Sequence, residues 1–337
     1  MSTAEQDTWV AKTLRIDVAA QRGAPPEATG GGPGKFISRL FKKKPTPPPP
    51  KPVPRAEIGG PQSARADKLL SAMSDEDQRK VNILLEKASD SQKKYLKKAI
   101  AMQHTAVELE AFFDEIDGKD AAWMEDNLHV VGDSEGKGIK QQWQCSCGPT
   151  TLQALRGELD PIYALQLHKD NPDLAKADDK KPTRLNPNMA QDQKDMLEFG
   201  SGVATARNKD GKGLALSSLL GRTSVKGYLG MSFESIDVEK AGYDPVLSDL
   251  DAALADGMPV PVRVGRKGEG SGHFALITGG EAGQPRRYSI HDPWEGKTVI
   301  VDEDQIKAKK LDVAGWPELT DIYKPSVMMP PDPPQGI

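Results

Sequence analysis

The sequence predicts an α+β fold, in which helical segments come first along the chain and strands follow. Two patterns carry this prediction. Apolar residues recur every three or four positions from Asp67 onward, and after Gly257 short apolar runs alternate with glycine-rich turns. Helices and strands segregated in this way are typical of α+β proteins. The 337-residue chain contains 37% apolar and 28% charged residues, the composition of a soluble globular protein.

Residues 1–66 are predicted to be a disordered tail. They hold 11 of the 27 prolines, and 11 basic residues against 5 acidic ones, in a chain whose net charge is −4. Such a composition buries too little apolar surface to offset the entropy lost on ordering the chain. Within the tail, residues 39–44 (RLFKKK) are interpreted either as a solvated linker or as a basic amphipathic segment for an anionic membrane or a partner.

The first ten residues lack a basic flank followed by an apolar run, so no Sec-type signal peptide is expected. No apolar stretch approaches the roughly 20 residues of a membrane-spanning helix, so no integral membrane segment is expected. We therefore expect the protein to be made in the cytoplasm. Any export would use a route that reads no cleavable N-terminal signal.

Residues 67–126 are predicted to form a helical hairpin. Ser74 begins a capping-box pattern ahead of one apolar stripe, and Ser89 or Asp90 begins a second stripe that continues to Phe113. A bundle this short must rest on the domain that follows, as a docked prodomain-like or adaptor element would.

Residues 127–325 are predicted to form the main domain, and residues 326–337 a disordered C-terminal tail. Helices are expected at 147–155, 162–168, 189–199, 214–220 and 249–256, the last of them after a strand at 232–238. Further strands are expected at 260–264, 274–278, 287–290 and 297–301.

The two cysteines, Cys145 and Cys147, are separated by one residue, which leaves a disulfide between them strained. A metal site would need two further ligands, and no histidine lies close in sequence, so no metal or other cofactor is expected. A reactive thiol is favoured. Cys147 precedes Gly148 and Pro149, which suit the first turn of a helix, and a helix N-terminus lowers the pKa of a thiol. Cys145 is interpreted as a small structural side chain in the preceding loop.

His273 stands at the head of the apolar run 274–277, and Asp292 ends the next predicted strand. Neighbouring strands of a hairpin bring such ends together, so Asp292 is predicted to accept a hydrogen bond from His273 Nδ1 and to orient the ring. A turn histidine and an aspartate that caps an Asp-Pro turn are the ordinary alternatives. His291 is expected to point to the opposite face. The other histidines are expected to have surface or core roles: His104, His129 and His168.

Three ordered blocks of the sequence are similar to those of papain-like cysteine peptidases related to the double-glycine leader peptidases of bacteriocin exporters. They are residues 141–152 (QQWQCSCGPTTL), 272–279 (GHFALITG) and 290–296 (IHDPWEG). The resemblance implies a papain-like fold, with the cysteine in a helical part and the histidine and aspartate on an antiparallel sheet. It also implies that a glutamine before the cysteine helps to form the oxyanion hole. Gln141 is favoured for this role, and Gln142 stays open.

Three residues within these blocks are predicted to contact substrate: Trp143, Trp294 and Gly272. The two tryptophans are equally well explained as aromatic anchors of the core. The resemblance implies acyl transfer by Cys147 and His273, with hydrolysis of a peptide bond after Gly-Gly. Deamidation or transfer to an amine would use the same residues, and a catalytically inactive peptide-binding module, with SH3-like partners for its tail, is the non-enzymatic alternative.

The tail itself contains Gly59-Gly60 and three glycines at 30–32, which raises the hypothesis of self-processing, although a proline follows each group. The overall layout is similar to that of bacterial toxins or effectors loaded into contractile injection systems. It implies a protein or peptide substrate, a cognate immunity protein, the injection apparatus as a partner, and export into a target cell. Nucleic acid is not among the expected partners. A housekeeping intracellular peptidase is the alternative.

Overall fold

The computed structural model describes residue 51 and residues 53–142, 146–171, 173–174, 189–191, 193, 229–266, 272–281 and 283–330. The predicted helix at 214–220, most of the one at 189–199 and residues 1–50 of the predicted tail lie outside these ranges, as do Trp143 and Cys145. Among the described residues, no helix is long and apolar enough to cross a membrane.

The segment after the tail is more helical than a hairpin. It contains α2 (Gly60–Ser71), α3 (Asp75–Lys87), α4 (Asp90–Ala101), α5 (Ala106–Ile116) and α6 (Ala121–Asn127). The predicted starts at Ser74 and Ser89 are confirmed, because each side chain accepts a backbone N–H of its helix. The predicted second helix is two helices, since Gln103 adopts a φ of 67° and Thr105 caps α5. These helices share one apolar core.

The predicted tail boundary at residue 66 is wrong. Helix α2 already begins at Gly60, with Pro61 in its first turn, where a proline costs no hydrogen bond. Arg65 and Ala66 are buried. The preceding residues also make defined contacts: Arg55 forms an antiparallel bridge with Gly279, and Ala56 N–H donates to Thr278 O at 2.8 Å. A proline- and glycine-rich composition therefore concealed an ordered arm at residues 53–59.

The rest of the described chain is built on one antiparallel sheet with the strand order β1-β6-β2-β3-β4-β5. Its strands are β1 (Met231–Asp237), β2 (Val260–Gly265), β3 (Gly272–Glu281), β4 (Arg287–Asp292), β5 (Lys297–Asp302) and β6 (Glu318–Val327). The combination of helices with one antiparallel sheet confirms the α+β class, although α12 and α13 lie between β1 and β2 and α14 lies between β5 and β6. The predicted strands are all present, each longer than predicted or shifted by a residue at its ends.

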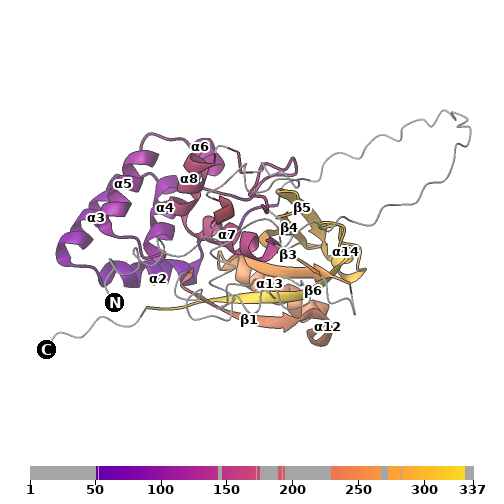
Figure 1. Cartoon of the computed structure of the whole chain (residues 1–337). Helices are drawn as coiled ribbons and strands as arrows, with labels where there is room; N and C mark the ends of the chain where they lie inside the picture. Colours follow the sequence, from indigo (N-terminus) through magenta and orange to yellow (C-terminus); the bar gives the residue numbers. More distant parts are fainter. Residues whose placement is uncertain are drawn as a thin grey trace, which may run out of the picture. The chain divides into compact units, whose positions relative to one another are not determined.

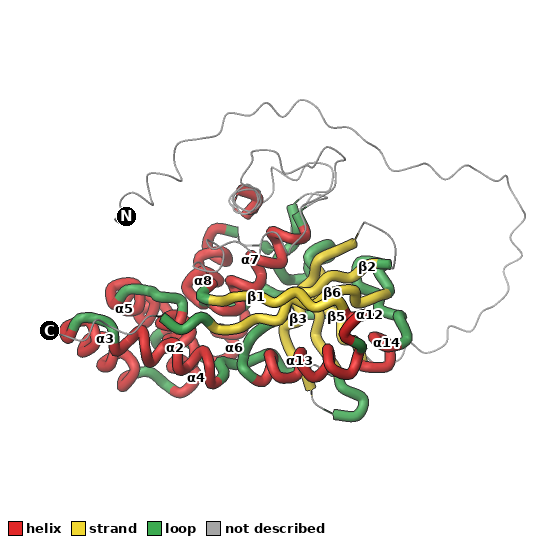
Figure 2. The backbone as a smooth tube through the Cα atoms, turned by 90° about the horizontal axis from the view of Figure 1, so that it is seen from below, coloured by secondary structure: helices red, strands yellow, loops and turns green. Residues whose placement is uncertain are grey.

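Helices cover both faces of this sheet (Figure 1 and Figure 2). On one side lie α7 (Cys147–Leu159) and α8 (Pro161–Asp170), and on the other α12 (Val238–Ala241), α13 (Tyr243–Ala255) and α14 (Glu303–Lys307). Side chains of β3 alternate between the two cores: Phe274 and Leu276 pack with α7, whereas Ala275 and Ile277 pack with α13. The helix that carries Cys147 is thus laid directly on the strand that carries His273.

Strand β6 was not predicted from the sequence, and the predicted domain end at residue 325 falls inside it. Pro325 argues against a strand, because proline cannot donate to a ladder. The structure accommodates it because pairing of β6 with β2 ends at Ile322, so the last residues of β6 have only β1 beside them. On that open side a missing N–H costs no hydrogen bond.

Candidate active site

Cys147 is the first residue of α7 and is partly exposed. Its helix begins where the sequence predicts but runs four residues further, to Leu159, before Asp160 ends it and caps α8. The rest of α7 is almost entirely buried against the sheet and the neighbouring helices. A buried helix therefore fixes a thiol at its own N-terminus, where the backbone dipole favours negative charge.

His273 and Asp292 come from adjacent strands and meet as predicted. His273 Nε2 lies 2.7 Å from Asp292 Oδ1, and both side chains are buried. The predicted nitrogen is wrong, since the bond uses Nε2 rather than Nδ1. Because Nε2 is engaged by Asp292, Nδ1 is the ring nitrogen left for another partner, and interaction with the thiol of Cys147 contributes to the raised pKa of His273. Asp292 Oδ1 accepts a second bond from Trp294 N–H, at 2.9 Å.

The three groups shift one another's protonation. Burial alone would raise the pKa of Cys147, but the hydrogen bond and charge of His273, helped by backbone N–H groups of Phe274 and Gly148, lower it. Burial would lower the pKa of His273, yet its bonds to Asp292 and Cys147 raise it to about 9. Burial likewise works against the ionised form of Asp292, and His273 lowers that pKa. Together these shifts favour a thiolate beside an imidazolium that is held by a carboxylate.

Gln141 and Gln142 belong to a segment that is bonded to the turn after Asp292. Gln141 N–H donates to Pro293 O at 2.7 Å, and Gly138 N–H to Gly296 O at 2.8 Å. Both glutamine side chains are buried. The side chain of Gln142 donates to Lys140 O at 2.9 Å, which directs its amide back to its own segment. Gln141 stays the predicted oxyanion-hole residue.

The predicted substrate contacts have different surroundings. Trp294 is 41% exposed and follows Asp292 by two residues, so its ring is available beside the site. Gly272 pairs with Gly265 at the end of the β2–β3 ladder, and a Cβ there would lie 2.8 Å from Arg263 Nε. A Cβ would also lie 2.9 Å from the carbonyl oxygen of Val264, and this backbone contact gives a structural reason for that glycine. Their contact with substrate stays a prediction.

The other histidines are bonded away from Cys147. His291 is fully buried, its Nε2 donates to Ile139 O at 3.0 Å, and burial lowers its pKa to about 4. His104 Nε2 lies 2.9 Å from Asp160 Oδ1. His168 Nε2 donates to the carbonyl oxygen of His129 at 2.7 Å. Among the described residues, no group of three or more His, Cys, Asp or Glu side chains is arranged to hold a metal ion.

Sequence reasoning missed a buried charge cluster at the opposite end of α7. Glu158 lies 2.7 Å from His129 Nδ1 and 3.5 Å from Arg55 Nη1, and it accepts the N–H groups of Val130 and Val131. Lys98 of α4 donates to the carbonyl oxygen of Glu158 at 2.9 Å. The cluster joins the N-terminal arm, the helical segment and α7. The partners of Glu158 lie 27 to 103 positions away from it along the chain, so no local pattern in the sequence signals the cluster.

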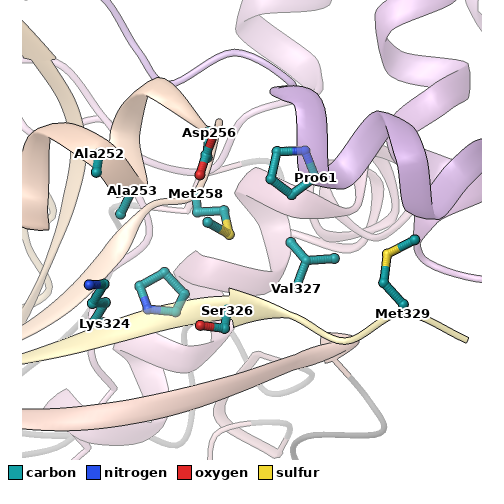
Figure 3. A pocket seen from close by; sticks show the side chains of 10 residues that line it. Pro61, Ala252, Ala253, Asp256, Met258, Lys324, Ser326, Val327 and Met329 are labelled. Atoms are coloured by element: carbon teal, nitrogen blue, oxygen red, sulfur yellow. The ribbon is translucent and has the colours of Figure 1, made fainter.

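A hollow of about 330 Å³ lies elsewhere, between the start of α2, the end of α13 and the last part of β6 (Figure 3). Pro61, Met258 and Val327 are among its lining residues, and none of Cys147, His273 or Asp292 is. The reactive groups, rather than this hollow, therefore define the candidate site.

Replacing Asp292 with alanine is expected to lower the pKa of His273 from about 9 toward the ordinary histidine value of about 6.5, because the hydrogen bond and the charge that favour the imidazolium are lost. The titration can be followed by NMR on protein with labelled histidines. His168→Ala serves as the control and identifies that residue's signal. An unchanged His273 titration in Asp292→Ala would contradict the assigned interaction.

The chain was compared with known proteins at three levels. No family model matches it, and no curated protein does. Among solved structures, SERA5E from Plasmodium falciparum aligns at 11% identity and a TM-score of 0.27, over 63% of this chain and 95% of that one. The SERA5 proenzyme from the same organism aligns at 10% identity and a TM-score of 0.28, over 75% and 81%. Likenesses this remote establish neither the family nor the function of this chain.

Proposed function

We propose that this chain is a cysteine peptidase of the papain-like class, with Cys147 as nucleophile, His273 as its acid–base partner and Asp292 as the residue that orients the histidine. The observation that carries the proposal is the Cys147–His273–Asp292 chain itself. It combines a helix-terminal thiol of lowered pKa with a histidine that is bonded to a buried carboxylate at 2.7 Å. A nucleophile, a base and a group that orients the base are the parts that covalent acyl transfer needs.

The reaction follows from these charges. The thiolate of Cys147 attacks the carbonyl carbon of the scissile bond and forms a tetrahedral oxyanion. His273 then gives its Nδ1 proton to the departing amine, which leaves a thioester on Cys147. A water molecule, deprotonated by His273, attacks the thioester and releases the acid and the thiolate. Asp292 stays ionised throughout and stabilises the imidazolium.

The oxyanion needs donors that are in place before the reaction begins. The backbone N–H of Cys147, at the start of α7, is one, and the side-chain amide of Gln141 is the proposed second. Removing one such donor typically lowers kcat about 10²- to 10³-fold. Gln141→Ala is therefore expected to slow acylation strongly while leaving the thiolate itself intact.

The substrate is proposed to be another protein rather than the chain's own Gly59-Gly60. A Cβ at Gly59 would lie 2.2 Å from the backbone of Asp256, and Gly60 is already the first residue of α2. A peptidase cleft binds its substrate as an extended chain. Gly59 is closely packed and the peptide bond after Gly60 lies in a helix, so this pair does not offer that conformation. Mass spectrometry of stored active enzyme is therefore expected to show no fragment cut after Gly60.

Comparison of wild type with Cys147→Ala tests the proposal. Each is incubated with a cell lysate, and new protein N-termini are profiled. Termini that appear only with wild type, preceded by small residues such as Gly-Gly, are expected. If wild type generates no termini while Cys147 reacts rapidly with iodoacetamide, peptide hydrolysis is refuted and deamidation or transfer takes its place. If Cys147 does not react at neutral pH, the non-catalytic module is favoured.

A further inference from the structure

The segment that leads to Cys147 is held by an unbroken run of bonds from its backbone. The N–H groups of residues 138, 139, 140 and 141 donate in turn to the carbonyl oxygens of Gly296, Val130, Leu174 and Pro293. The next one, Gln142 N–H, donates to a side chain instead, Gln193 Oε1, at 3.1 Å. Gln193 thus bonds to Gln142, the last residue that the structure describes before residues 143–145.

Gln193 bonds this segment as a neighbouring strand would. Its Oε1 accepts the N–H of Gln142, and its Nε2 approaches Lys140 O at 3.4 Å, so one planar amide spans both sides of Gln141. The side chain is fully buried. A primary amide carries both an acceptor and two donors, which suits it to replace a peptide group in this way.

The same amide also reaches α7. Gln193 Nε2 donates to Gln153 Oε1 at 3.1 Å, and Gln153 Nε2 donates to the hydroxyl of Tyr163 at 2.9 Å. Gln153 lies six residues after Cys147 on α7, and Tyr163 lies on α8. One side chain therefore ties the backbone before Cys147 to the helix after it.

We propose that Gln193 is a positioning residue, which fixes the backbone on both sides of Gln141 relative to α7 and so sets the Gln141 amide at the oxyanion position. This inference rests on the proposed function, because it assigns Gln193 to the same acyl-transfer site. Gln193 touches no reacting atom. Replacing Gln193 is therefore expected to slow the step in which an oxyanion develops and to leave the reactivity of the Cys147 thiolate unchanged. A displacement of about 1 Å in an oxyanion donor can slow such a step up to about 100-fold.

Two reagents separate these effects. Iodoacetamide alkylates a thiolate by displacement at a saturated carbon and forms no oxyanion, so its rate reports the Cys147–His273 pair. p-Nitrophenyl acetate acylates the same thiolate through a tetrahedral oxyanion and releases p-nitrophenolate, so its rate also reports the oxyanion hole. In Gln193→Met, acylation is expected to fall about 10- to 100-fold, while alkylation stays within about twofold of wild type.

The chain offers a matched control in Gln92, another buried glutamine, whose Nε2 donates to Ile116 O at 2.9 Å in the helical segment. Gln92→Met removes comparable hydrogen bonds in the helical segment, at a position distant in sequence from Cys147. The rates of alkylation and of acylation should therefore both stay at the wild-type level. Since Gln193 acts through Gln141, adding Gln193→Met to Gln141→Ala should slow acylation by less than about twofold further, instead of multiplying the two losses.

Equal loss of both rates in Gln193→Met, or no loss of acylation, overturns the positioning role. If that variant does not fold, as judged by thermal unfolding, Gln193→Glu decides by the same two rates, because it keeps the acceptor for Gln142 N–H and loses both donors. Failure of the proposed function looks different. In that case the wild-type protein itself reacts with neither reagent at Cys147.

Discussion

Replacing His273 with alanine is expected to slow alkylation of Cys147 by iodoacetamide about 10- to 100-fold at pH 6.5. In wild type, His273 lowers the pKa of the thiol against the opposing effect of burial. Without the histidine, only the backbone N–H groups of Phe274 and Gly148 oppose burial, so the thiol is expected to titrate near its ordinary pKa of about 8.5, and only about 1% is thiolate at pH 6.5. Rates measured from pH 5 to 10 would show the variant's curve displaced to higher pH.

The proposed peptide hydrolysis should depend on pH differently from the alkylation of Cys147 by iodoacetamide. The thiolate exists above the lowered pKa of Cys147, and the imidazolium of His273 exists below about 9. Peptide cleavage needs both, so kcat/KM should rise on the acid side and fall again as the pH passes about 9. Alkylation needs only the thiolate and should not fall. The control variant His168→Ala should show the same two pH profiles as wild type. If both reactions of the wild type lost rate above about pH 9 in the same way, the ion pair of Cys147 and His273 would be contradicted.

Replacing Glu158 with leucine is expected to destabilise the protein by about 3–5 kcal/mol, the usual cost of removing one partner from a buried charge cluster. Arg55 would keep only its ion pair with Glu125, Lys98 would lose the nearby charge of the Glu158 carboxylate, and the N–H groups of Val130 and Val131 would lose their acceptor. Thermal unfolding should show a fall in Tm on the order of 10 °C. Glu76→Leu, which removes an exposed carboxylate paired with Lys80, should leave Tm unchanged.

The contribution of Glu158 should also depend on pH. Burial would raise the pKa of its carboxyl group, but the charges of His129 and Arg55 outweigh burial and lower it. A lowered folded-state pKa means that the stabilisation is complete above the ordinary glutamate value of about 4.5 and is lost as the pH falls below it. The gap in stability between wild type and Glu158→Leu should therefore narrow in acid. A gap that is constant from pH 7 to pH 3 would argue against an ionised Glu158.

The placement of the reactive residues could be predicted because the signals were local. Gly148 and Pro149 mark the start of a helix at Cys147, and apolar runs bounded by turns mark the strands that carry His273 and Asp292. The ring nitrogen that faces Asp292 could not be predicted, because it depends on the rotation of the His273 side chain. Sequence spacing carries no information about that rotation.

Contacts between distant parts of the chain were the main omission. Gln193 lies 51 positions from Gln142, and Arg55 lies 103 positions from Glu158. Buried polar residues of this kind resemble surface residues in a sequence, because only the fold brings their partners near. The same limit hid the arm, whose composition resembles that of the tail before it but whose partners lie on β3.

The ordered arm has a practical consequence for anyone who shortens this protein. A chain trimmed to begin at Asp67, where the helical periodicity starts, would lose Arg55 from the Glu158 cluster and Ala56 from the side of β3. Thr278 O and Gly279 would then lie on a bare strand edge beyond the end of β2. Bare edges invite pairing with other molecules, so such a truncation is expected to self-associate, whereas one that begins at Lys51 keeps the edge covered.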